Sequence, residues 1–568
     1  MISKLPLLKR RSPSLRAIAY LAIFSLTVFF SLSCAQVATT ATATAASGAG
    51  ATLALGTNLN GINDWSTEVP FLDAFKLSRE WLTQCEGGEP GCTGGWATDE
   101  FDQLDLDEHG WVKSLPAPED SPEFTRVRTI LFGGNGKFES GQYVVLYDGE
   151  GTIEYVYDAV KDEAASRPGR DVLNVDFSRD GEGIHLIITA TDPKKTGNYI
   201  RNIRVVPIAY EATYEQQIFN PVFLERTKKF SAIRFMDWMN TNETKQRDWA
   251  NRPKVDDRSY ALGKGVPVEI MVQLANRLGA NPWFNMPHAA TDDYVRNFAR
   301  LVKQQLDPGL NAYVELSNEV WNWSFPQSQY ALAQGKARWG EDKGDSYMQW
   351  YGMRSAQISD IWKREFGADR DRVVAVFGTQ TAWQGLEEMV LNCPYWVAEG
   401  NKPCHEQADA YAITGYVSGN LGAPEHQKTI ESWLSQADGG SSKAFEWLSK
   451  DMKVVSDAFT YHAKVAKDKG LRLVAYEGGQ HVVGWQGVEN NEKLTNLFIE
   501  VNRHPKMREI YTQLLNDWQK SGGTLFMHFS DISEPSKWGS WGALEYVNQE
   551  SSPKYDALME FIEQNRLR

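Results

Sequence analysis

The chain has 568 residues, a formal net charge of −14 and 42% hydrophobic residues. One compact core seldom extends over so many residues, so we expect a leader and two folded domains. The negative charge argues against a nucleic-acid partner, which needs a basic surface, and leaves neutral ligands open. The 20 tryptophans are many for this length and suit either a carbohydrate site, where indole rings stack on sugar faces, or an aromatic-rich core.

Residues 1–35 are expected to be an export signal. Positively charged residues precede the apolar run 17–33, and small residues follow it. Cleavage after Ala35 predicts a secreted protein. Lipidation of Cys34 instead predicts a cell-surface protein attached to the membrane, and an uncleaved anchor is a third possibility. Residues 36–50 form an Ala/Thr/Gly/Ser tract, which predicts a flexible linker.

The other four cysteines form two close couples, Cys85 with Cys92 and Cys393 with Cys404. In an exported protein such couples usually become disulfides that hold loops together. A metal site is the alternative interpretation, but the couples lie far apart in the sequence and lack CxxC spacing. We therefore expect two disulfides, and neither a metal nor a cofactor.

The first strand is expected to start near residue 52, and residues 51–97 are assigned to the first part of a barrel. Residues 98–210 have a different character, with alternating apolar and polar residues and turn pairs such as Asp148-Gly149. This segment predicts an inserted all-β sandwich domain. It either binds glycan or forms one structural wall of a cleft.

Residues 211–568 alternate buried-strand patterns with helical patterns and complete the barrel. In one unit, a strand over 283–286 precedes a helix capped by Thr291, and the next strand follows at 312. Such βαβ units imply parallel strands. Counting the first strand, eight strands are expected, starting near 52, 232, 283, 312, 373, 408, 471 and 524. Helices are expected over 346–366 and 454–469.

The predicted fold class is therefore α/β: a (β/α)8 TIM barrel with the β-sandwich inserted between the first and second barrel strands. A doubly wound open sheet is the alternative. It normally has a glycine-rich phosphate loop after its first strand, and the sequence GTNLNGIND has no GxGxxG motif.

Two glutamates follow predicted barrel strands. Glu319 comes after the fourth strand and Glu477 after the seventh. Active sites of barrels lie at the carboxyl ends of the strands, so both side chains are expected at the same mouth. Cleavage of a glycosidic bond needs two carboxyl groups on either side of that bond, about 5–5.5 Å apart when configuration is retained.

The Asn318-Glu319 pair after strand four, with Glu477 after strand seven, resembles the clan of retaining glycoside hydrolases on (β/α)8 barrels, which includes cellulases, mannanases and xylanases. The resemblance covers the chain after residue 210, and no family within the clan is identified. It implies a hydrolase acting on a β-linked polysaccharide or oligosaccharide, with Glu319 as acid/base and Glu477 as nucleophile. Asn318 would bind the sugar 2-hydroxyl.

The same resemblance suggests further substrate-binding residues. Arg234, at the end of strand two, would keep Glu477 ionised. The alternative is that Arg234 pairs with Asp237 alone. Tyr416, after strand six, would donate a hydrogen bond to Glu477 or pack in its loop. His288, after strand three, would line the same subsite or cap the following helix.

Tryptophans near the strand ends are candidates for stacking on sugar. Trp538 or Trp541, after strand eight, would supply the platform, and Trp321 would form cleft wall or core. Glu315 is a rival for the catalytic glutamate, but a position within the strand puts it below the mouth. A glycan-binding protein without catalysis is the second hypothesis, and it would be favoured by loss of either glutamate.

Overall fold

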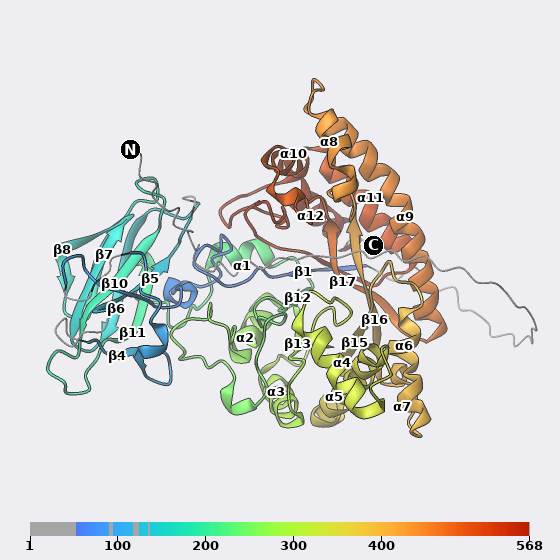
Figure 1. Ribbon diagram of the computed structural model, residues 1–568, viewed down its shortest axis with the longest axis horizontal. Coiled ribbons are helices and arrows are strands. Elements are labelled where there is room, and N and C mark those ends of the chain that lie inside the picture. The colour runs from blue at the N-terminus through green and yellow to red at the C-terminus, as the bar shows by residue number, and fades with distance from the viewer. Residues whose placement is uncertain (1–52, 90–91, 93–94, 117–123, 135–136, 567–568) are drawn as a thin grey trace, which may run out of the picture.

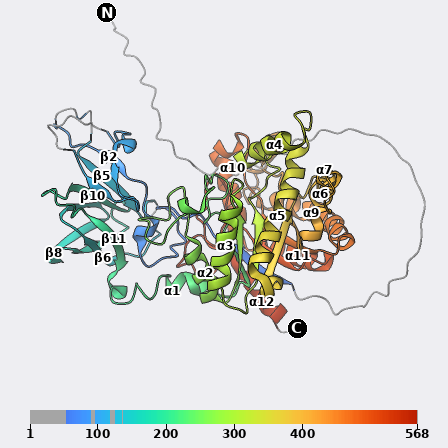
Figure 2. The same ribbon diagram turned by 90° about the horizontal axis from the view of Figure 1, so that it is seen from below.

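The computed structural model describes residues 53–566 except for 90–91, 93–94, 117–123 and 135–136. The predicted signal over 1–35, with Cys34, and the linker over 36–50 lie outside the described residues. Figure 1 shows two parts along the longest axis, with antiparallel sheets on the left and a barrel wrapped by helices on the right. Figure 2 shows the same division from below.

The predicted barrel of eight parallel strands is confirmed. The strands pair in the order in which they occur along the chain, and β1 closes the ring by pairing with the last strand. They are β1 (Ala54–Asn58), β12 (Ala232–Arg234), β13 (Asn281–Met286), β14 (Ala312–Leu316), β15 (Val373–Gly378), β16 (Ala410–Val417), β17 (Arg472–Gln480) and β18 (Leu525–His528). Because a closed ring of parallel strands has all its carboxyl ends on one side, the residues after each strand meet at one mouth.

Helices surround the barrel. They are α1 (Pro221–Thr227), α2 (Val268–Leu278), α3 (Asp292–Gln305), α4 (Pro326–Trp339), α5 (Ser346–Phe366), α6 (Leu386–Asn392), α7 (Pro394–Ala398), α8 (Gln427–Trp433), α9 (Ser441–Asp468), α10 (Glu492–Arg503), α11 (Lys506–Ser521) and α12 (Pro553–Arg566). Their apolar faces and the barrel strands share one continuous hydrophobic core.

Local chemistry explains where these helices begin and end. The Thr291 side chain accepts a hydrogen bond from the Tyr294 amide and caps α3, as predicted. The α2 helix ends at Gly279, which has a φ of 63° that favours glycine. The α9 helix was predicted from residue 454 but begins at Ser441, because its earlier turns also bury an apolar stripe that includes Phe445 and Leu448.

Two four-stranded antiparallel sheets lie between β1 and β12 in the sequence. Their orders are β2-β5-β10-β7 and β11-β6-β9-β8. The strands are β2 (Leu82–Gln84), β5 (Arg126–Leu131), β6 (Gly141–Asp148), β7 (Gly151–Tyr157), β8 (Ala159–Arg167), β9 (Arg170–Val175), β10 (Ile184–Thr191) and β11 (Arg201–Pro207), and a separate pair is β3 (Asp105–Leu106) with β4 (Val112–Ser114). Apolar residues of both sheets form a second core.

The β2 strand joins this antiparallel region although it precedes residue 98. It pairs with β5 and so extends the antiparallel region back to Leu82. The short sequence LTQ has little alternation, so its partner was not evident from the sequence. Both expected disulfides, Cys85–Cys92 and Cys393–Cys404, are present. Among the described helices, none is long and apolar enough to span a membrane.

Candidate active site

Glu319 lies three residues beyond the end of β14, and Glu477 lies near the end of β17. Both are held at the same mouth of the barrel. Ser317 and Glu319 have φ values of 57° and 41°, a left-handed conformation that is uncommon for residues with a side chain. The tight turn that they form redirects the chain directly after the strand. Such backbone strain is often found at functional sites.

A bulge in β17 gives the second glutamate its position. Ile413 of β16 is opposite Ala475, but the next residue, Thr414, is opposite Glu477, so Tyr476 is the extra residue. A bulge re-aims side chains that strict alternation would send to opposite faces. Tyr476 and Glu477, although consecutive, therefore both reach polar partners in the mouth of the barrel.

Arg234, the last residue of β12, is the fully buried cation at the centre of the site. Its guanidinium donates to the Glu477 carboxylate from Nη1 at 2.8 Å, and to Glu315 Oε2 from Nε at 3.1 Å and Nη2 at 2.9 Å. It also donates to the Asn58 and Asn318 side-chain oxygens at 3.0 and 2.9 Å. These bonds use the planar fork of donors, which a lysine lacks.

The expected contact between Arg234 and Glu477 is thus present, together with a second carboxylate that was not expected as its partner. Glu315 lies within β14, below the mouth, where the Trp283 indole and the Asn285 amide also donate to it. Burial raises the pKa of Glu315, and Arg234 opposes that rise. Glu315 accepts four hydrogen bonds in all, two of them from Arg234, and is the counter-ion that fixes the guanidinium.

The Glu477 carboxyl group is nearly fully buried. Burial raises its pKa to about 8, Arg234 opposes that rise, and the negative charge of Glu319 adds to it. The Tyr416 hydroxyl donates to the second Glu477 oxygen at 3.0 Å, as expected for that tyrosine. Donation from the guanidinium and the hydroxyl favours the carboxylate and so opposes the effect of burial.

Glu319 is half-buried and has separate partners. The Tyr476 hydroxyl donates to Oε1 at 2.8 Å, and the Asn322 amide donates to Oε2 at 3.0 Å. Burial and the two glutamates raise the pKa of Tyr476, so its hydroxyl keeps its proton. Glu319 is therefore oriented by neutral donors, whereas Glu477 is held by a cation.

Asn318 is buried between these two groups. Its side-chain oxygen accepts from Arg234, and its amide donates to the Asn242 oxygen at 3.1 Å. Gln327 donates to the same Asn242 oxygen and to the Asn318 backbone oxygen. An amide nitrogen has two hydrogens, and among the described residues Asn242 accepts one of them. The second hydrogen of Asn318 is left for a further acceptor.

The aromatic candidates differ in their placement. Trp541 contacts Tyr416 and His481, with ring centroids 5.9 and 5.2 Å apart, so it lies beside the partner of Glu477. Trp538 is stacked below the Lys537 ammonium instead. Trp321 is almost fully buried and packs edge-on against Tyr476.

His288 follows β13 and is buried against Tyr330, with ring centroids 5.1 Å apart. Burial lowers the pKa of His288 to about 4, so the imidazole is neutral at pH 7. Within the described part of the chain, its Nδ1 has no hydrogen-bond partner. Among the described residues, no hydrogen bond or ion pair joins His288 to Glu319, Glu477 or Arg234.

Sequence reasoning missed several residues that complete the site. Tyr476 and Asn322 hold Glu319, Asn58 holds Arg234, and Asn242 holds Asn318. Asn58 ends the first barrel strand, and that position was a usable signal. Asn242 lies in the long segment between β12 and α2, where no periodicity indicates which side chain turns inward.

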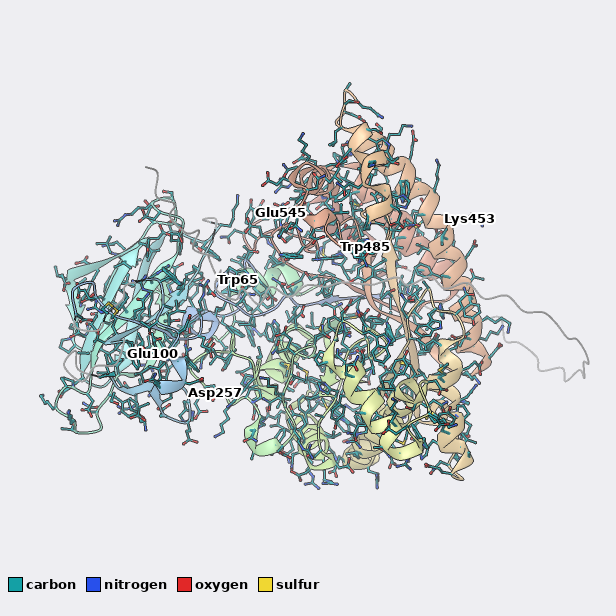
Figure 3. The ribbon with its side chains drawn as sticks, in the orientation of Figure 1. Trp65, Glu100, Asp257, Lys453, Trp485 and Glu545 are labelled. Carbon is teal, nitrogen blue, oxygen red and sulfur yellow. A yellow bond between two sulfur atoms is a disulfide. The ribbon has the colours of Figure 1, made fainter. Side chains whose placement is uncertain are left out.

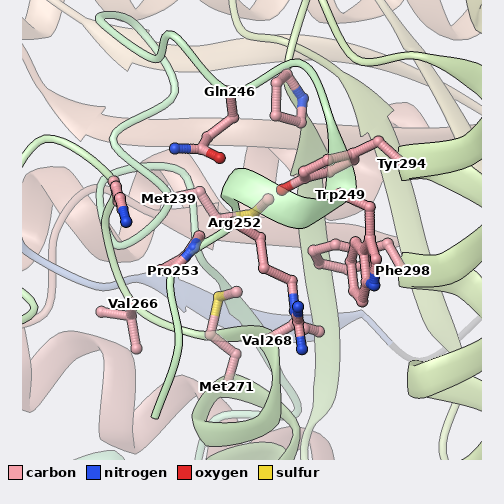
Figure 4. Close-up of a pocket in the computed structure, with 12 residues that line it drawn as sticks. Met239, Gln246, Trp249, Arg252, Pro253, Val266, Val268, Met271, Tyr294 and Phe298 are labelled. Carbon is pink, nitrogen blue, oxygen red and sulfur yellow. The ribbon is translucent and has the colours of Figure 1, made fainter. Parts of the chain in front are cut away.

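A small cavity lies beside the segment that follows β12 (Figure 4). Its volume is about 10 Å³ and its lining includes Gln246, Trp249 and Tyr294. That is room for about one water molecule, so the cavity does not accommodate a sugar ring. In the described residues, His109, Asp256 and Asp257 form the one group with metal-ligand spacing, and it contains no carboxylate of the barrel mouth.

No protein-family model and no curated protein matches the chain. Several solved structures are similar to it. An α-L-arabinofuranosidase of family 51 from Bifidobacterium longum is 12% identical over 61% of this chain and 67% of its own, with a TM-score of 0.34. A 4-O-α-L-rhamnosyl-β-D-glucuronidase from Fusarium oxysporum is 13% identical over 60% of this chain and 63% of its own, with a TM-score of 0.35.

A GH5-4 endoglucanase from Clostridium acetobutylicum is 12% identical over 60% of this chain and 89% of its own, with a TM-score of 0.33. All three matches are glycoside hydrolases, the class that the sequence resembles. The identities are low and the TM-scores lie below 0.5, so neither a family nor an activity follows from them.

Proposed function

We propose that the protein is a retaining glycoside hydrolase that cleaves a β-linked polysaccharide or oligosaccharide. The observation that carries this proposal is the unequal environment of two glutamates at one barrel mouth. Arg234 contacts Glu477 and not Glu319, while neutral donors contact Glu319. Paired carboxyl groups whose environments differ in this way are suited to separate acid and nucleophile roles.

In the first step, a Glu477 oxygen attacks the anomeric carbon and the glycosidic C–O bond breaks. Glu319 gives its proton to the leaving oxygen, so a glycosyl ester on Glu477 and a free alcohol are formed. Arg234 and the Tyr416 hydroxyl both donate to Glu477, which favours the carboxylate as the attacking form. Glu319, which is oriented by neutral donors, supplies the proton to the leaving oxygen.

In the second step, Glu319 takes a proton from water and the water oxygen attacks the anomeric carbon. The ester bond breaks, Glu477 leaves as a carboxylate, and the configuration is retained after two inversions. Arg234 and the Tyr416 hydroxyl stabilise the departing carboxylate. The same two donors thus serve the nucleophile at both ends of the cycle.

Substrate contacts follow from the arrangement of the neighbouring side chains. The remaining amide hydrogen of Asn318 is assigned to the sugar 2-hydroxyl. Trp541, beside Tyr416, is the better stacking platform next to Glu477 than Trp538. Trp321 and His288 are assigned supporting positions, since both side chains are largely buried.

We further propose that the two antiparallel sheets form an all-β sandwich domain over residues 82–207, inserted between the first and second barrel strands, with the catalytic barrel before and after it. Their shared core supports one domain. We also propose export through the signal over 1–35 and release or lipid attachment at the cell surface, consistent with two disulfides.

The test is a screen of residues 50–568 against mixed-linkage β-glucan, glucomannan, xylan and p-nitrophenyl β-glycosides. Glu477→Gln and Glu319→Gln are assayed in parallel, with Glu365→Gln, a surface glutamate, as the matched control. Cleavage that is lost in the first two variants and kept in the control supports the proposal. Cleavage that survives both site variants would refute the assignment, and binding without cleavage would favour a glycan-binding protein.

A further inference from the structure

Three exposed tryptophans lie in loops at the carboxyl ends of barrel strands. Trp65 follows β1 and is 48% exposed, Trp323 follows β14 and is 46% exposed, and Trp383 follows β15 and is 47% exposed. Single exposed apolar side chains are common on protein surfaces. These three indoles, however, occur on the face that carries Glu319 and Glu477, where a bound ligand would meet them.

The order of strands around the barrel puts these tryptophans on opposite rims. The β15 strand is four strand steps from β1 in either direction around the eight-stranded ring, and β14 is next to β15. Trp65 therefore lies on one rim, and Trp323 and Trp383 lie together on the opposite rim. The carboxyl end of β17, which bears Glu477, lies between the two rims, and Glu319 follows β14 on the side of Trp323.

Each rim is held by contacts that leave part of the indole free. The Trp65 ring lies over the Arg79 guanidinium at 5.8 Å, and Arg79 is fixed by an ion pair of 2.7 Å with Asp64. The Arg79 amide also donates to Ile130 of β5. The antiparallel sheets thus support this rim, and Figure 3 shows Trp65 between the sheets and the barrel.

The opposite rim is tied directly to the acid/base. Trp323 follows Asn322, whose amide holds Glu319, and packs on Tyr347 with ring centroids 4.9 Å apart. The Trp383 loop is anchored by Thr381, whose hydroxyl bonds to the Thr414 hydroxyl at 2.7 Å. This rim is therefore on the side of the residue that protonates the leaving group.

We propose that these tryptophans form two sugar-binding platforms for one neutral β-linked glycan that crosses the mouth of the barrel. This inference rests on the proposed function. Trp323 and Trp383 bind the leaving-group end of the chain, and Trp65 binds the other end. The indole faces stack on the apolar faces of sugar rings, and the net charge of −14 favours an uncharged glycan. A site with platforms on both sides cleaves within the chain.

The test combines hydrolysis with affinity electrophoresis in gels containing mixed-linkage β-glucan, glucomannan or xylan. Trp65→Ala and Trp383→Ala are made in the wild type and in the inactive Glu477→Gln protein. Trp96→Ala is the matched control, because Trp96 is 42% exposed and packs on Arg128 in the antiparallel region. We expect about a tenfold loss of kcat/KM and of gel retardation for each platform variant with the polysaccharide, and none for the control.

The loss should grow with the length of the substrate, being greatest for the polysaccharide and smallest for a p-nitrophenyl monosaccharide. Polysaccharide cleavage that depends on Glu477 but is unchanged in both platform variants would overturn this inference and leave the proposed function standing. Retardation that depends on the platforms, without any cleavage by the wild type, would support the platforms and refute the enzyme. Neither cleavage nor retardation with any of the three glycans would overturn both.

Discussion

Arg234 joins residues of several barrel strands through one side chain. It contacts Asn58 of β1, Glu315 of β14 and Glu477 of β17, and it is fully buried. A buried cation with two carboxylates is stable only when its donors are satisfied, because desolvation of each charge costs several kcal/mol. Arg234 therefore opposes the rise in the pKa of Glu477 and also fixes the shape of the mouth.

Replacing Arg234 with lysine should lower kcat/KM by roughly a hundredfold and also lower the Tm, since the three donors of an ammonium group cannot replace the five hydrogen bonds of the guanidinium. Steady-state kinetics and thermal unfolding measure the two effects. Arg258→Lys is the matched control, because Arg258 is equally buried but bonds Ser78 and Arg79. Equal losses of activity in the two variants would mean that Arg234 acts only through stability.

Tyr476 is the second residue whose role is testable by itself. Its hydroxyl donates to Glu319 at 2.8 Å and so fixes the direction of that carboxyl group. Tyr476→Phe should lower kcat by roughly ten- to a hundredfold in steady-state kinetics, because Glu319 loses the donor that orients it.

Tyr143→Phe is the control for Tyr476, since it removes a buried hydroxyl that donates to the Glu139 carbonyl in the antiparallel region. A kcat that falls no further in Tyr476→Phe than in Tyr143→Phe would contradict this orienting role.

The segments after β1 and β18 are joined by a buried acid pair. Glu68 and Asp531 are both buried, and Asp531 also accepts from the Asn60 amide at 3.1 Å. Burial raises the pKa of Asp531 to about 7 and raises the pKa of Glu68 well above its usual range, where Asp531 adds to the rise. The raised pKa values favour the protonated form of Glu68, in which its carboxyl group can donate a hydrogen bond to Asp531.

This pair predicts how stability depends on pH. Because the folded pKa values are raised, the folded state binds more protons than the unfolded state above about pH 4. The free energy of unfolding that this pair contributes is fully present below about pH 4. It is lost as the pH rises through the folded pKa of Asp531 near 7. Tm should therefore fall between pH 5 and pH 8.

Glu68→Gln keeps a donor to Asp531 and removes one titrating group, so its Tm should fall less over the same range. Glu269→Gln, at a partly exposed ion pair with Arg252, is the control. Parallel curves for the wild type and Glu68→Gln would contradict this account of the pair.

The sequence predicts those strands and helices that are set by local patterns, and not those features that depend on contacts between distant segments. Buried parallel strands are short apolar runs followed by capped helices, so all eight barrel strands were predictable. The bulge at Tyr476 was not, because it depends on the register between β16 and β17. The contact of Asn242 with Asn318 and the pairing of β2 with β5 were not predictable either, since each depends on packing between distant segments.

At the scale of the whole molecule, the antiparallel region and the barrel are linked through the rim of the mouth. The Gly133 amide donates to the Asp64 carbonyl at 2.8 Å, and the Thr67 hydroxyl donates to the Glu545 carbonyl at 2.7 Å. The loops after β1, β5 and β18 therefore hold one another in place. The antiparallel sheets thus help to shape the cleft as well as enlarging the protein.

Platforms on both rims predict cleavage within the polysaccharide. The viscosity of the cleaved glycan should fall steeply while few reducing ends have formed, because a cut in the middle halves the chain length. Viscometry and a reducing-sugar assay on the same samples measure the two quantities. Release of a single small product with little change in viscosity would indicate cleavage from one end and contradict the open cleft.

The most direct test of the central claim is the anomeric configuration of the first product, followed by ¹H NMR during hydrolysis of the β-linked substrate found in the screen. A double displacement through Glu477 predicts that the β-anomer appears first and the α-anomer only later, by mutarotation. The α-anomer as the first product would mean a single displacement by water. It would contradict the assignment of Glu477 as nucleophile.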